Sequence, residues 1–425
     1  MTLVPEGYLR RLVEDKIQAM LETAGAVSIE GPKHCGKTWC VRSLSNSEYS
    51  LEDPGNDSIN LHIAKGDPAV ALEGDEPHLI DEWQDVPRIW DAVRYTVDQD
   101  GRKGRFILCS SSSADRSKIS HSGAGRIVDI RMRTMSLYES GDSDGKVSLR
   151  GLFDGDLKTV KVDPLGLEEL SWLIVRGGWP GLLESDESSV RQFLSERIDE
   201  ICEKDVRKVD GKRRDVVKLK RFFRSLARNE SKVVTKKRLS SDISSDEEDL
   251  DNDTVTDYLD VLDRLHLIED QPSFSPNYRS SVRVGKNPKR HLADPSLAVA
   301  ALGLDKKALM SDLRTMGFLF EALCERDLRI YADTIGGELY HYRDHGNREI
   351  DAVVELKNEG WGAFEIKLGQ DVIDEGAENL KRIRDFMERD GARCPKFLCV
   401  ITGQGGYAYR REDGVYVVPI TALGP

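Results

Sequence analysis

The stretch from Gly31 to Thr38 is the part of this sequence best suited to chemistry. It reads Gly31, Pro32, Lys33, His34, Cys35, Gly36, Lys37 and Thr38, and it matches G-x-x-x-x-G-K-[ST] at every fixed position. The glycines let the backbone curl so that its N–H groups face phosphate oxygens, Lys37 can reach the β and γ phosphates, and the Thr38 hydroxyl can coordinate Mg²⁺. The helix that follows, with Trp39, adds the positive end of its dipole. The pattern predicts a site for ATP and Mg²⁺.

Two acids further along supply what such a site also needs. The segment His78-Leu79-Ile80-Asp81-Glu82-Trp83 reads as a short apolar strand that ends in two carboxylates. We expect this strand to lie beside the P-loop strand in the sheet, with Asp81 near the metal and Glu82 polarising the attacking water. The alternative is an ordinary strand end followed by an acidic turn.

Two weaker features follow the acids. The strand Phe106–Cys109 ends in Ser110-Ser111-Ser112, where Ser111 is our choice for a side chain that senses the γ-phosphate. Arg126 precedes another apolar strand and can reach a neighbouring subunit's nucleotide as an arginine finger. The alternatives are a plain polar loop for Ser111 and a surface or carboxylate-paired arginine for Arg126.

A second constellation lies near the end of the chain. Asp351, followed by Glu365-Ile366-Lys367, fits the D-x(n)-E-x-K pattern of restriction-type nucleases. Asp351 and Glu365 at adjoining strand ends can share a divalent metal, and Lys367, on the same strand face as Glu365, can orient the attacking water. Glu321 on the preceding helix is a further candidate ligand, and Gln370 and Asn379 are accessory candidates. The pattern by itself is common, and the same fold also serves non-catalytic binding.

Short apolar strands alternating with helices position the first constellation. We expect a helix over 8–23 and strands over Ala26–Glu30, Pro77–Asp81, Arg105–Cys109 and Ile127–Met132. This alternation is typical of an α/β fold with a parallel sheet and crossover helices.

The rest of the chain changes character twice. Residues 165–226 are mostly helical, and residues 215–270 indicate a small module with helices near 219–227, 236–243 and 254–266, followed by a β-wing over 276–291. The tail predicts helices over 317–332 and 375–388 and five strands: 339–343, 349–354, 361–367, 396–402 and 415–419.

Taken together, these motifs resemble the prokaryotic AAA+-type ATPases of the archaeal-ATPase-like class that carry a C-terminal restriction-endonuclease-like domain. The resemblance rests on G-P-K-H-C-G-K-T, H-L-I-D-E, G-A-G-R, G-G-W-P, K-N-P-K-R-H-L-A-D-P-S-L and the tail motif, from about Tyr8 to about Thr402. It implies that Gly178 and Pro180 lie in a helical lid near the base or ribose, that the middle module is a winged helix, and that the protein is a homo-oligomer. Ser110 departs from the family, which usually has glycine there.

The charges around the middle module point in two directions. Basic residues cluster before and within it and suit phosphate contacts with double-stranded DNA: Lys204, Arg207, Lys208, Lys212, Arg213, Arg214, Lys218, Lys220, Arg221, Lys236, Lys237 and Arg238. The acidic run over 244–253 lies next to the third helix and repels phosphate. DNA contact and a protein-facing or solvated surface both remain open.

Composition limits the class of protein. The formal net charge is -13, so a nucleic-acid site must be a local basic patch. The seven cysteines are irregularly spaced, without C-x-x-C, which favours reduced thiols in a cytoplasmic protein. We expect no signal peptide, because the first thirty residues lack an apolar core, and no membrane span, because no 18-residue apolar stretch occurs.

These observations predict a multidomain α/β protein. Its expected parts are an AAA+-like ATPase core over 1–150, a helical lid over 151–214, a winged-helix-like module over 215–304 and a restriction-endonuclease-like domain over 305–425. We expect an ATPase coupled to a nuclease-like tail and acting on DNA. The alternative is a signalling or scaffold ATPase whose tail only binds nucleic acid or a protein partner; a small-molecule kinase is disfavoured, because the added modules are not substrate lids.

Overall fold

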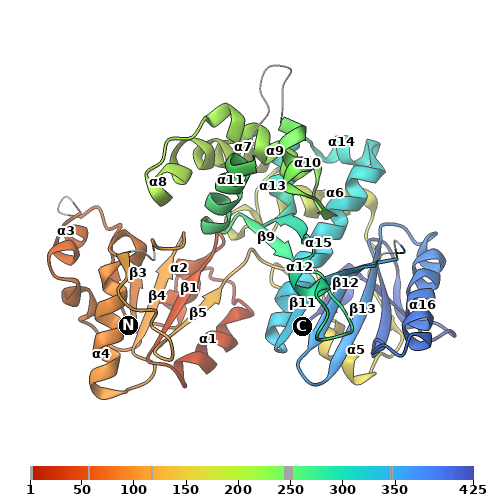
Figure 1. The fold of residues 1–425 in the computed structure, drawn as a ribbon, viewed down its shortest axis with the longest axis horizontal. Coiled ribbons are helices and arrows are strands. Elements are labelled where there is room, and N and C mark those ends of the chain that lie inside the picture. The colour runs from red at the N-terminus through yellow and green to blue at the C-terminus, as the bar shows by residue number, and fades with distance from the viewer. Residues whose placement is uncertain (1–2, 56–57, 116–117, 244–251, 345, 347) are drawn as a thin grey trace. The chain divides into compact units, whose positions relative to one another are not determined.

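The chain forms two compact units, each assembled from segments that are distant in sequence (Figure 1). The computed structural model describes residues 3–55, 58–115, 118–243, 252–344, 346 and 348–425. Unit 1 comprises Met1–Thr134, Glu203–Arg214 and Asp260–Leu267. Unit 2 comprises Met135–Cys202, Asp215–Leu259 and Ile268–Pro425. The predicted ATPase range therefore contributes mostly to unit 1, and the other three predicted ranges contribute mostly to unit 2.

Unit 1 is built on a five-stranded parallel sheet in the order β2-β3-β4-β1-β5. The strands are β1 (Ala26–Glu30), β2 (Ser47–Ser50), β3 (His78–Asp81), β4 (Phe106–Ser110) and β5 (Ile127–Arg131). The helices are α1 (Val13–Leu21), α2 (Lys37–Ser43), α3 (Ile59–Gly66), α4 (Arg88–Asp100) and α8 (Val206–Asp210). All four strands predicted in this part of the chain are present, and the parallel sheet is confirmed.

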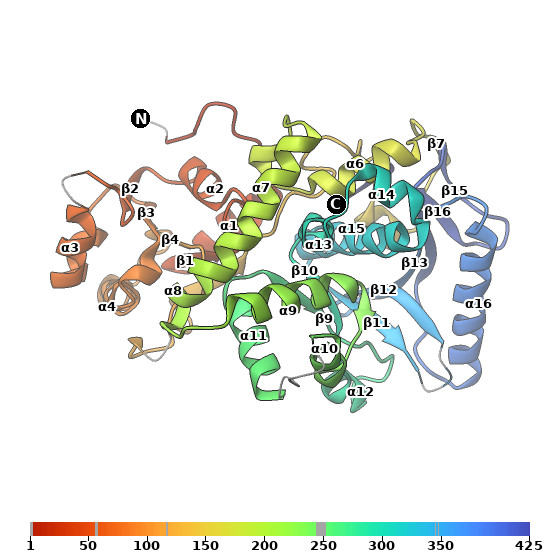
Figure 2. The same ribbon diagram turned by 90° about the horizontal axis from the view of Figure 1, so that it is seen from above.

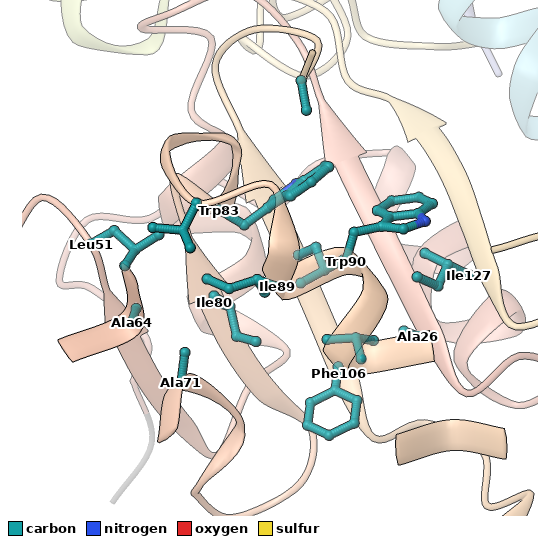
Figure 3. Close-up of a cluster of buried hydrophobic side chains, with 14 of the residues drawn as sticks. Ala26, Leu51, Ala64, Ala71, Ile80, Trp83, Ile89, Trp90, Phe106 and Ile127 are labelled. Carbon is teal, nitrogen blue, oxygen red and sulfur yellow. The ribbon is translucent and has the colours of Figure 1, made fainter. Parts of the chain in front are cut away.

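One face of this sheet is packed by α3 and α4. Alternate strand residues point to the same face of a sheet, and Ala26, Ile80 and Phe106 share a buried cluster with residues of α4. Figure 3 shows Trp90 of α4 in this cluster beside Trp83, and the two indole centroids are 5.1 Å apart. This packing fixes the segment that carries Asp81 and Glu82 against the sheet.

The expected position of the strand ending in Asp81 was wrong. Strand β3 does not lie beside the P-loop strand β1, because β4 lies between them and pairs with both. Four of the five residues of β4 are apolar and all five are buried. A strand of this composition is typical of the centre of a parallel sheet, covered on both faces.

Unit 2 begins with helices and a small antiparallel sheet. The helices are α5 (Leu149–Asp154), α6 (Leu167–Arg176), α7 (Glu187–Glu200), α9 (Val216–Arg228), α10 (Lys236–Ile243), α11 (Asn252–Arg264, which ends in unit 1), α12 (Val282–Gly285), α13 (Pro295–Leu302) and α14 (Lys306–Ser311). The antiparallel sheet has the order β8-β10-β9, from Lys232–Val233, Lys289–Leu292 and Ile268–Gln271. A π-helix at Ile201–Asp205 joins α7 to α8.

The three helices predicted in the middle module are α9, α10 and α11, but the predicted wing differs. The strands β9 and β10 pair over 268–271 and 289–292, so most of 276–291 is their connection, and it contains the short helix α12. The acidic run predicted to repel phosphate lies largely outside the described residues.

The remainder of unit 2 is a seven-stranded mixed sheet in the order β11-β12-β13-β14-β16-β15-β7. Its strands are Gly337–Arg343, Glu349–Leu356, Gly360–Lys367, Phe397–Thr402, Tyr416–Pro419, Tyr407–Arg410 and Val160–Lys161, and a separate pair joins β17 (Leu423–Gly424) to β6 (Val147–Ser148). Helices α15 (Leu313–Thr334) and α16 (Ile373–Arg389) lie on opposite sides of this sheet (Figures 1 and 2). All the strands and helices predicted in the tail are present. Among the described residues, no helix is both long and apolar enough to cross a membrane.

Candidate functional site

The loop from Gly31 to Gly36 connects β1 to α2 in unit 1. Gly36 has φ of 95° and His34 has φ of 68°, so the loop turns through left-handed conformations before the helix begins. A Cβ atom on Gly31 would lie 2.2 Å from the carbonyl oxygen of Met132, so no other residue fits there without displacing β5. The backbone thus curls as phosphate binding requires, next to the amino end of a helix.

Lys37 and Thr38 stand at the first positions of α2. The buried Lys37 ammonium donates to the carbonyl oxygen of Pro32 at 2.9 Å, within its own loop. The Thr38 hydroxyl lies 3.5 Å from the Asp81 carboxylate, although β4 separates the two strands. Burial, and then the charge of Glu82, raise the pKa of Asp81.

Glu82 is held in a defined direction by neighbouring side chains. Its backbone has φ of 56°, an uncommon conformation for a residue other than glycine. The Ser111 hydroxyl donates to its carboxylate at 2.7 Å, and the Gln84 amide donates to the same oxygen. Ser111, predicted to sense phosphate, is therefore a direct neighbour of the predicted catalytic acid.

Removing the Ser111 hydroxyl tests this arrangement. Ser111→Ala is expected to lower ATP turnover about fivefold, because one hydrogen bond that orients Glu82 contributes about 1 kcal/mol. The Kd for ATP is expected to change by less than about twofold. Steady-state ATPase kinetics and equilibrium binding measure the two quantities, with Ser112→Ala as the matched control. Equal turnover in all three proteins would contradict a role for Ser111 in orienting Glu82.

Arg126 lies at the other end of the strands. It immediately precedes β5, and its carbonyl accepts from the amide of Ala26 at the start of β1. In a parallel sheet this is the edge opposite the one at which the P-loop begins. The guanidinium is half exposed and pairs with Asp98 at 2.6 Å. Arg126 is thus directed away from the nucleotide site of its own chain.

Two segments far along the chain contact the P-loop region within unit 1. The Lys33 ammonium donates to the buried Asp205 carboxylate at 2.8 Å. The imidazole of His266 lies 3.6 Å from the Glu30 carboxylate, at the end of β1. The backbone amide of Ser113 donates to the carbonyl of Arg264 at 2.8 Å. Sequence reasoning missed these contacts because nothing in the local pattern places residues 203–214 and 260–267 beside the loop.

The other predicted loop residues differ in exposure. Cys35 is buried, and its carbonyl accepts from Arg11 at 2.7 Å, whereas the Trp39 side chain is 45% exposed. Gly178 and Pro180 belong to unit 2, not to the unit of the P-loop. The Gly178 amide donates to the Asp294 carboxylate at 3.0 Å, so the G-G-W-P and A-D-P-S motifs pack on each other.

The basic residues around the middle module do not belong to one unit. Residues 203–214 lie in unit 1, and Lys218 and the following basic residues lie in unit 2. Several have carboxylate partners: Arg214 pairs with Asp210 at 2.7 Å, and Lys220 pairs with Asp199 at 2.7 Å. On helix α11, Val255, Leu259 and Leu262 are buried, so this side of the helix belongs to the core.

The tail residues meet in a group that we call the acidic cluster, comprising Glu321, Glu325, Asp351 and Glu365. Glu321 and Glu325 lie on α15, Asp351 on β12 and Glu365 on β13. Burial, and then the charge of Asp351, raise the pKa of Glu365 to about 8, and burial raises that of Glu325 to about 7.

Two lysines and an amide complete this cluster. Lys367 pairs with Glu365 at 3.0 Å, and Asn379 donates to the other oxygen of Glu365 at 3.1 Å. The Asp351 carboxylate accepts from the amide of Ile366 at 2.8 Å. The second lysine, Lys289, contacts both Glu321 and Glu325. Sequence reasoning missed Lys289 because it lies on β10, outside the tail.

The geometry of the tail does not itself form a metal site. Across the part of the chain that the structure describes, no group of three or more His, Cys, Asp or Glu side chains is arranged to hold a metal ion. A P-loop site would need fewer carboxylates, because Mg²⁺ in such sites also takes a hydroxyl and phosphate oxygens.

Comparison with known proteins supports the nucleotide site. Residues 23–141 match the model of an AAA domain. This region, with its P-loop and parallel sheet, is of the P-loop ATPase type. Two further matches are to domains of unknown function, DUF8612 over residues 167–308 and DUF4143 over residues 316–423.

Two relatives match most of the chain. The chain is 26% identical to the uncharacterized proteins Rv2008c of Mycobacterium tuberculosis and Mb2031c of Mycobacterium bovis, over 84% of its length and 74% of theirs. Among solved structures, the Walker-type ATPase of Pyrococcus abyssi aligns with a TM-score of 0.43 at 11% identity, covering 71% of this chain and 99% of that one. The AMPPCP-bound DnaA of Aquifex aeolicus aligns at 0.28 and 13% identity, covering 59% and 86%.

Proposed function

We propose that this protein is an AAA+-type ATPase that binds and hydrolyses ATP and couples hydrolysis to an action on DNA through its middle and C-terminal parts. One observation carries the ATPase part. Thr38 lies within 3.5 Å of Asp81, and Ser111 holds Glu82 beside it, so groups from β1, β3 and β4 meet at one edge of the sheet. Ligands of α/β proteins bind outside the carboxyl ends of parallel strands, where these groups meet.

The roles of the residues follow from their chemistry. Lys37 stabilises the charge on the β and γ phosphates, and Thr38 with Asp81 holds Mg²⁺. Glu82, oriented by Ser111, polarises the water that attacks the γ phosphorus. The donation from Lys37 to Pro32 is exchanged for phosphate when ATP binds, since an ammonium pairs more strongly with an anion than with a carbonyl.

We also propose that the protein works as a homo-oligomer, in which Arg126 leaves Asp98 to reach the nucleotide of an adjacent subunit. The position of Arg126 at the opposite end of the strands from its own P-loop supports this proposal. An arginine supplied in this way raises turnover by stabilising the charge of the transition state.

The action on DNA rests on two modules of unit 2. Three helices and a three-stranded antiparallel sheet in the order α9-β8-α10-α11-β9-β10 support a winged helix. The helix with Glu321, the strand with Asp351 and the strand with Glu365 and Lys367 support a restriction-endonuclease-like domain. Both kinds of module bind double-stranded DNA in other proteins, so we assign DNA as the effector.

ATP turnover measured with and without double-stranded DNA tests this proposal. We expect DNA to raise turnover by about fivefold or more. This is the effect of a coupling free energy of about 1 kcal/mol or more between the DNA site and the ATP site. This rise in turnover is expected to disappear at high salt. Contacts with DNA phosphates release counterions, so the affinity for DNA falls as the salt concentration increases.

A second candidate function, a signalling or scaffold ATPase, is favoured by the absence of a metal-binding group among the described tail residues. Unchanged turnover, no gel shift with DNA and a stable protein partner would support this second function and contradict the first.

A further inference from the structure

One lysine of the acidic cluster, Lys289, comes from strand β10, which belongs to a different sheet from the strands that carry Asp351 and Glu365. Lys289 pairs through its backbone with Gln271 of β9 and Val233 of β8, so it belongs to the three-stranded sheet. Its side chain is only 1% exposed. Lysine is rarely buried to this degree unless its charge is paired.

The Lys289 ammonium uses all of its hydrogen-bonding capacity inside the cluster. It donates to Glu321, to Glu325 at 2.6 Å and to the carbonyl oxygen of Asp351 at 3.2 Å. An ammonium has three donors, and three acceptors surround this one. Burial opposes its charge, but the carboxylates of Glu321 and Glu325 outweigh burial and raise the pKa of Lys289, so the group is a cation at neutral pH.

One of these acceptors, Glu321, is also a predicted ligand of a divalent ion. Mg²⁺ takes oxygen ligands at about 2.0–2.1 Å in octahedral geometry. Glu321 is the helix acid of the D-x(n)-E-x-K pattern, and it is paired with Lys289, as Glu365 is with Lys367 at 3.0 Å. Lys367 belongs to the pattern, but Lys289 does not, and a divalent ion brought beside Glu321 would be repelled by the buried Lys289 ammonium. The residues present therefore do not fit a metal while Lys289 is in place.

We propose that Lys289 is a built-in counter-ion that takes the place of a divalent cation in the acidic cluster and keeps the C-terminal sheet in a metal-free, inactive form. This inference deepens the proposed function of the tail and rests on its restriction-endonuclease-like assignment. Because Lys289 lies on β10, a metal can enter the acidic cluster only when β10 moves and takes the Lys289 ammonium out of it.

The contacts of β10 show how such a withdrawal would be controlled. Gln271, paired with Lys289 in the sheet, donates through its side chain to the carbonyls of Tyr340, at 2.7 Å, and Asp351, at 3.3 Å. His291, two residues along β10, lies 3.1 Å from Glu230 and 3.4 Å from Glu325. The small sheet and the cluster are thus joined by polar contacts, which DNA bound to the middle module can exchange.

The test is Mn²⁺ binding, measured by electron paramagnetic resonance without nucleotide or DNA. Every protein carries Asp81→Asn, so that the P-loop contributes no metal site. We expect no Mn²⁺ at the cluster in this reference protein. We expect Mn²⁺ to bind after Lys289→Met, which keeps the side chain's volume and removes its charge, because Glu321 and Glu325 are then released to turn toward the ion. Adding Glu321→Gln to Lys289→Met is expected to weaken that binding at least about tenfold, because one of the ligands is lost.

Lys232→Met is the matched control, because Lys232 lies in the same small sheet but outside the cluster. It is expected to gain no Mn²⁺. A folded Lys289→Met protein, judged by circular dichroism, that binds no Mn²⁺ would overturn the proposal. So would Mn²⁺ in the reference protein that is lost on Asp351→Asn, and this second measurement decides the matter even if Lys289→Met fails to fold. Because neither ATP nor DNA is used, a failure here is distinct from a failure of the proposed ATPase function.

Discussion

Lys37→Ala is expected to abolish binding of ATP with Mg²⁺, whereas Glu82→Gln is expected to bind ATP normally and to lose turnover. Lys37 is buried at the mouth of the loop, and it is the group placed to meet the β and γ phosphates. Glu82 is held by Ser111 and Gln84, and loss of its proposed role in polarising the attacking water is expected to lower turnover by about 10²–10⁴-fold. The two substitutions therefore separate binding from chemistry.

The measurements are nucleotide binding by isothermal titration calorimetry and phosphate release at saturating ATP. Lys103→Ala and Glu73→Gln are the controls, because both residues are exposed and lie in unit 1 away from the P-loop. Both controls are expected to match the unaltered protein. If Glu82→Gln turned over ATP at the normal rate, another residue would have to activate water.

Asp294→Ala is expected to destabilise the protein by about 3–5 kcal/mol, as breaking a buried ion pair typically does. Asp294 is fully buried, caps α13 through the amide of Ser296 at 3.0 Å and pairs with Arg326 at 3.0 Å. It also accepts from the amide of Gly178 at 3.0 Å. Its removal leaves the Arg326 charge with only one of its two buried carboxylates, Asp327.

Chemical denaturation with urea measures this loss, and Asp305→Ala is the matched control. Asp305 caps α14 in the same way, through the amide of Ala308 at 2.7 Å, but it is more exposed and not part of a buried ion pair. Loss of the cap alone is expected to cost about 1 kcal/mol. Equal losses for the two variants would show that the ion pair with Arg326 contributes nothing beyond the cap.

The pH dependence of the same measurement has a defined sign. Burial opposes the charge of Asp294, but Arg326 and the hydrogen bonds from Ser296 and Gly178 lower its pKa below the usual value of 3.8. A carboxyl group with a lowered pKa contributes its full stability above pH 3.8 and loses that contribution as the pH falls through the folded-state value. The difference between the unaltered protein and Asp294→Ala is therefore expected to shrink only in strong acid.

The sequence predicted elements well where the signal is local. Strands such as Ala26–Glu30 and Phe397–Thr402 are short apolar runs between turn residues, and helix α16 repeats apolar residues at helical spacing. The P-loop was recognisable because its glycines, lysine and threonine are consecutive. Local sequence therefore located both chemical constellations.

Relations between distant segments could not be predicted in this way. Strand β4 lies between β1 and β3. This order depends on which apolar strand is best buried on both faces, and the residues next to each strand do not reveal it. Lys289 lies 62 residues before Asp351, and its basic neighbours gave it the character of a surface residue. The pairing of Lys33 with Asp205 could not be predicted either, because 172 residues separate them. Charges that are paired over such distances look like solvated charges until the fold is known.

Binding of a non-hydrolysable ATP analogue by the unaltered chain, with and without Mg²⁺, tests the central claim most directly. We predict one nucleotide site per chain. Adding Mg²⁺ is expected to raise the affinity of the unaltered chain for the analogue, but not that of Asp81→Asn. A chain that binds no adenine nucleotide under either condition would contradict the assignment of residues 31–38 as the phosphate site.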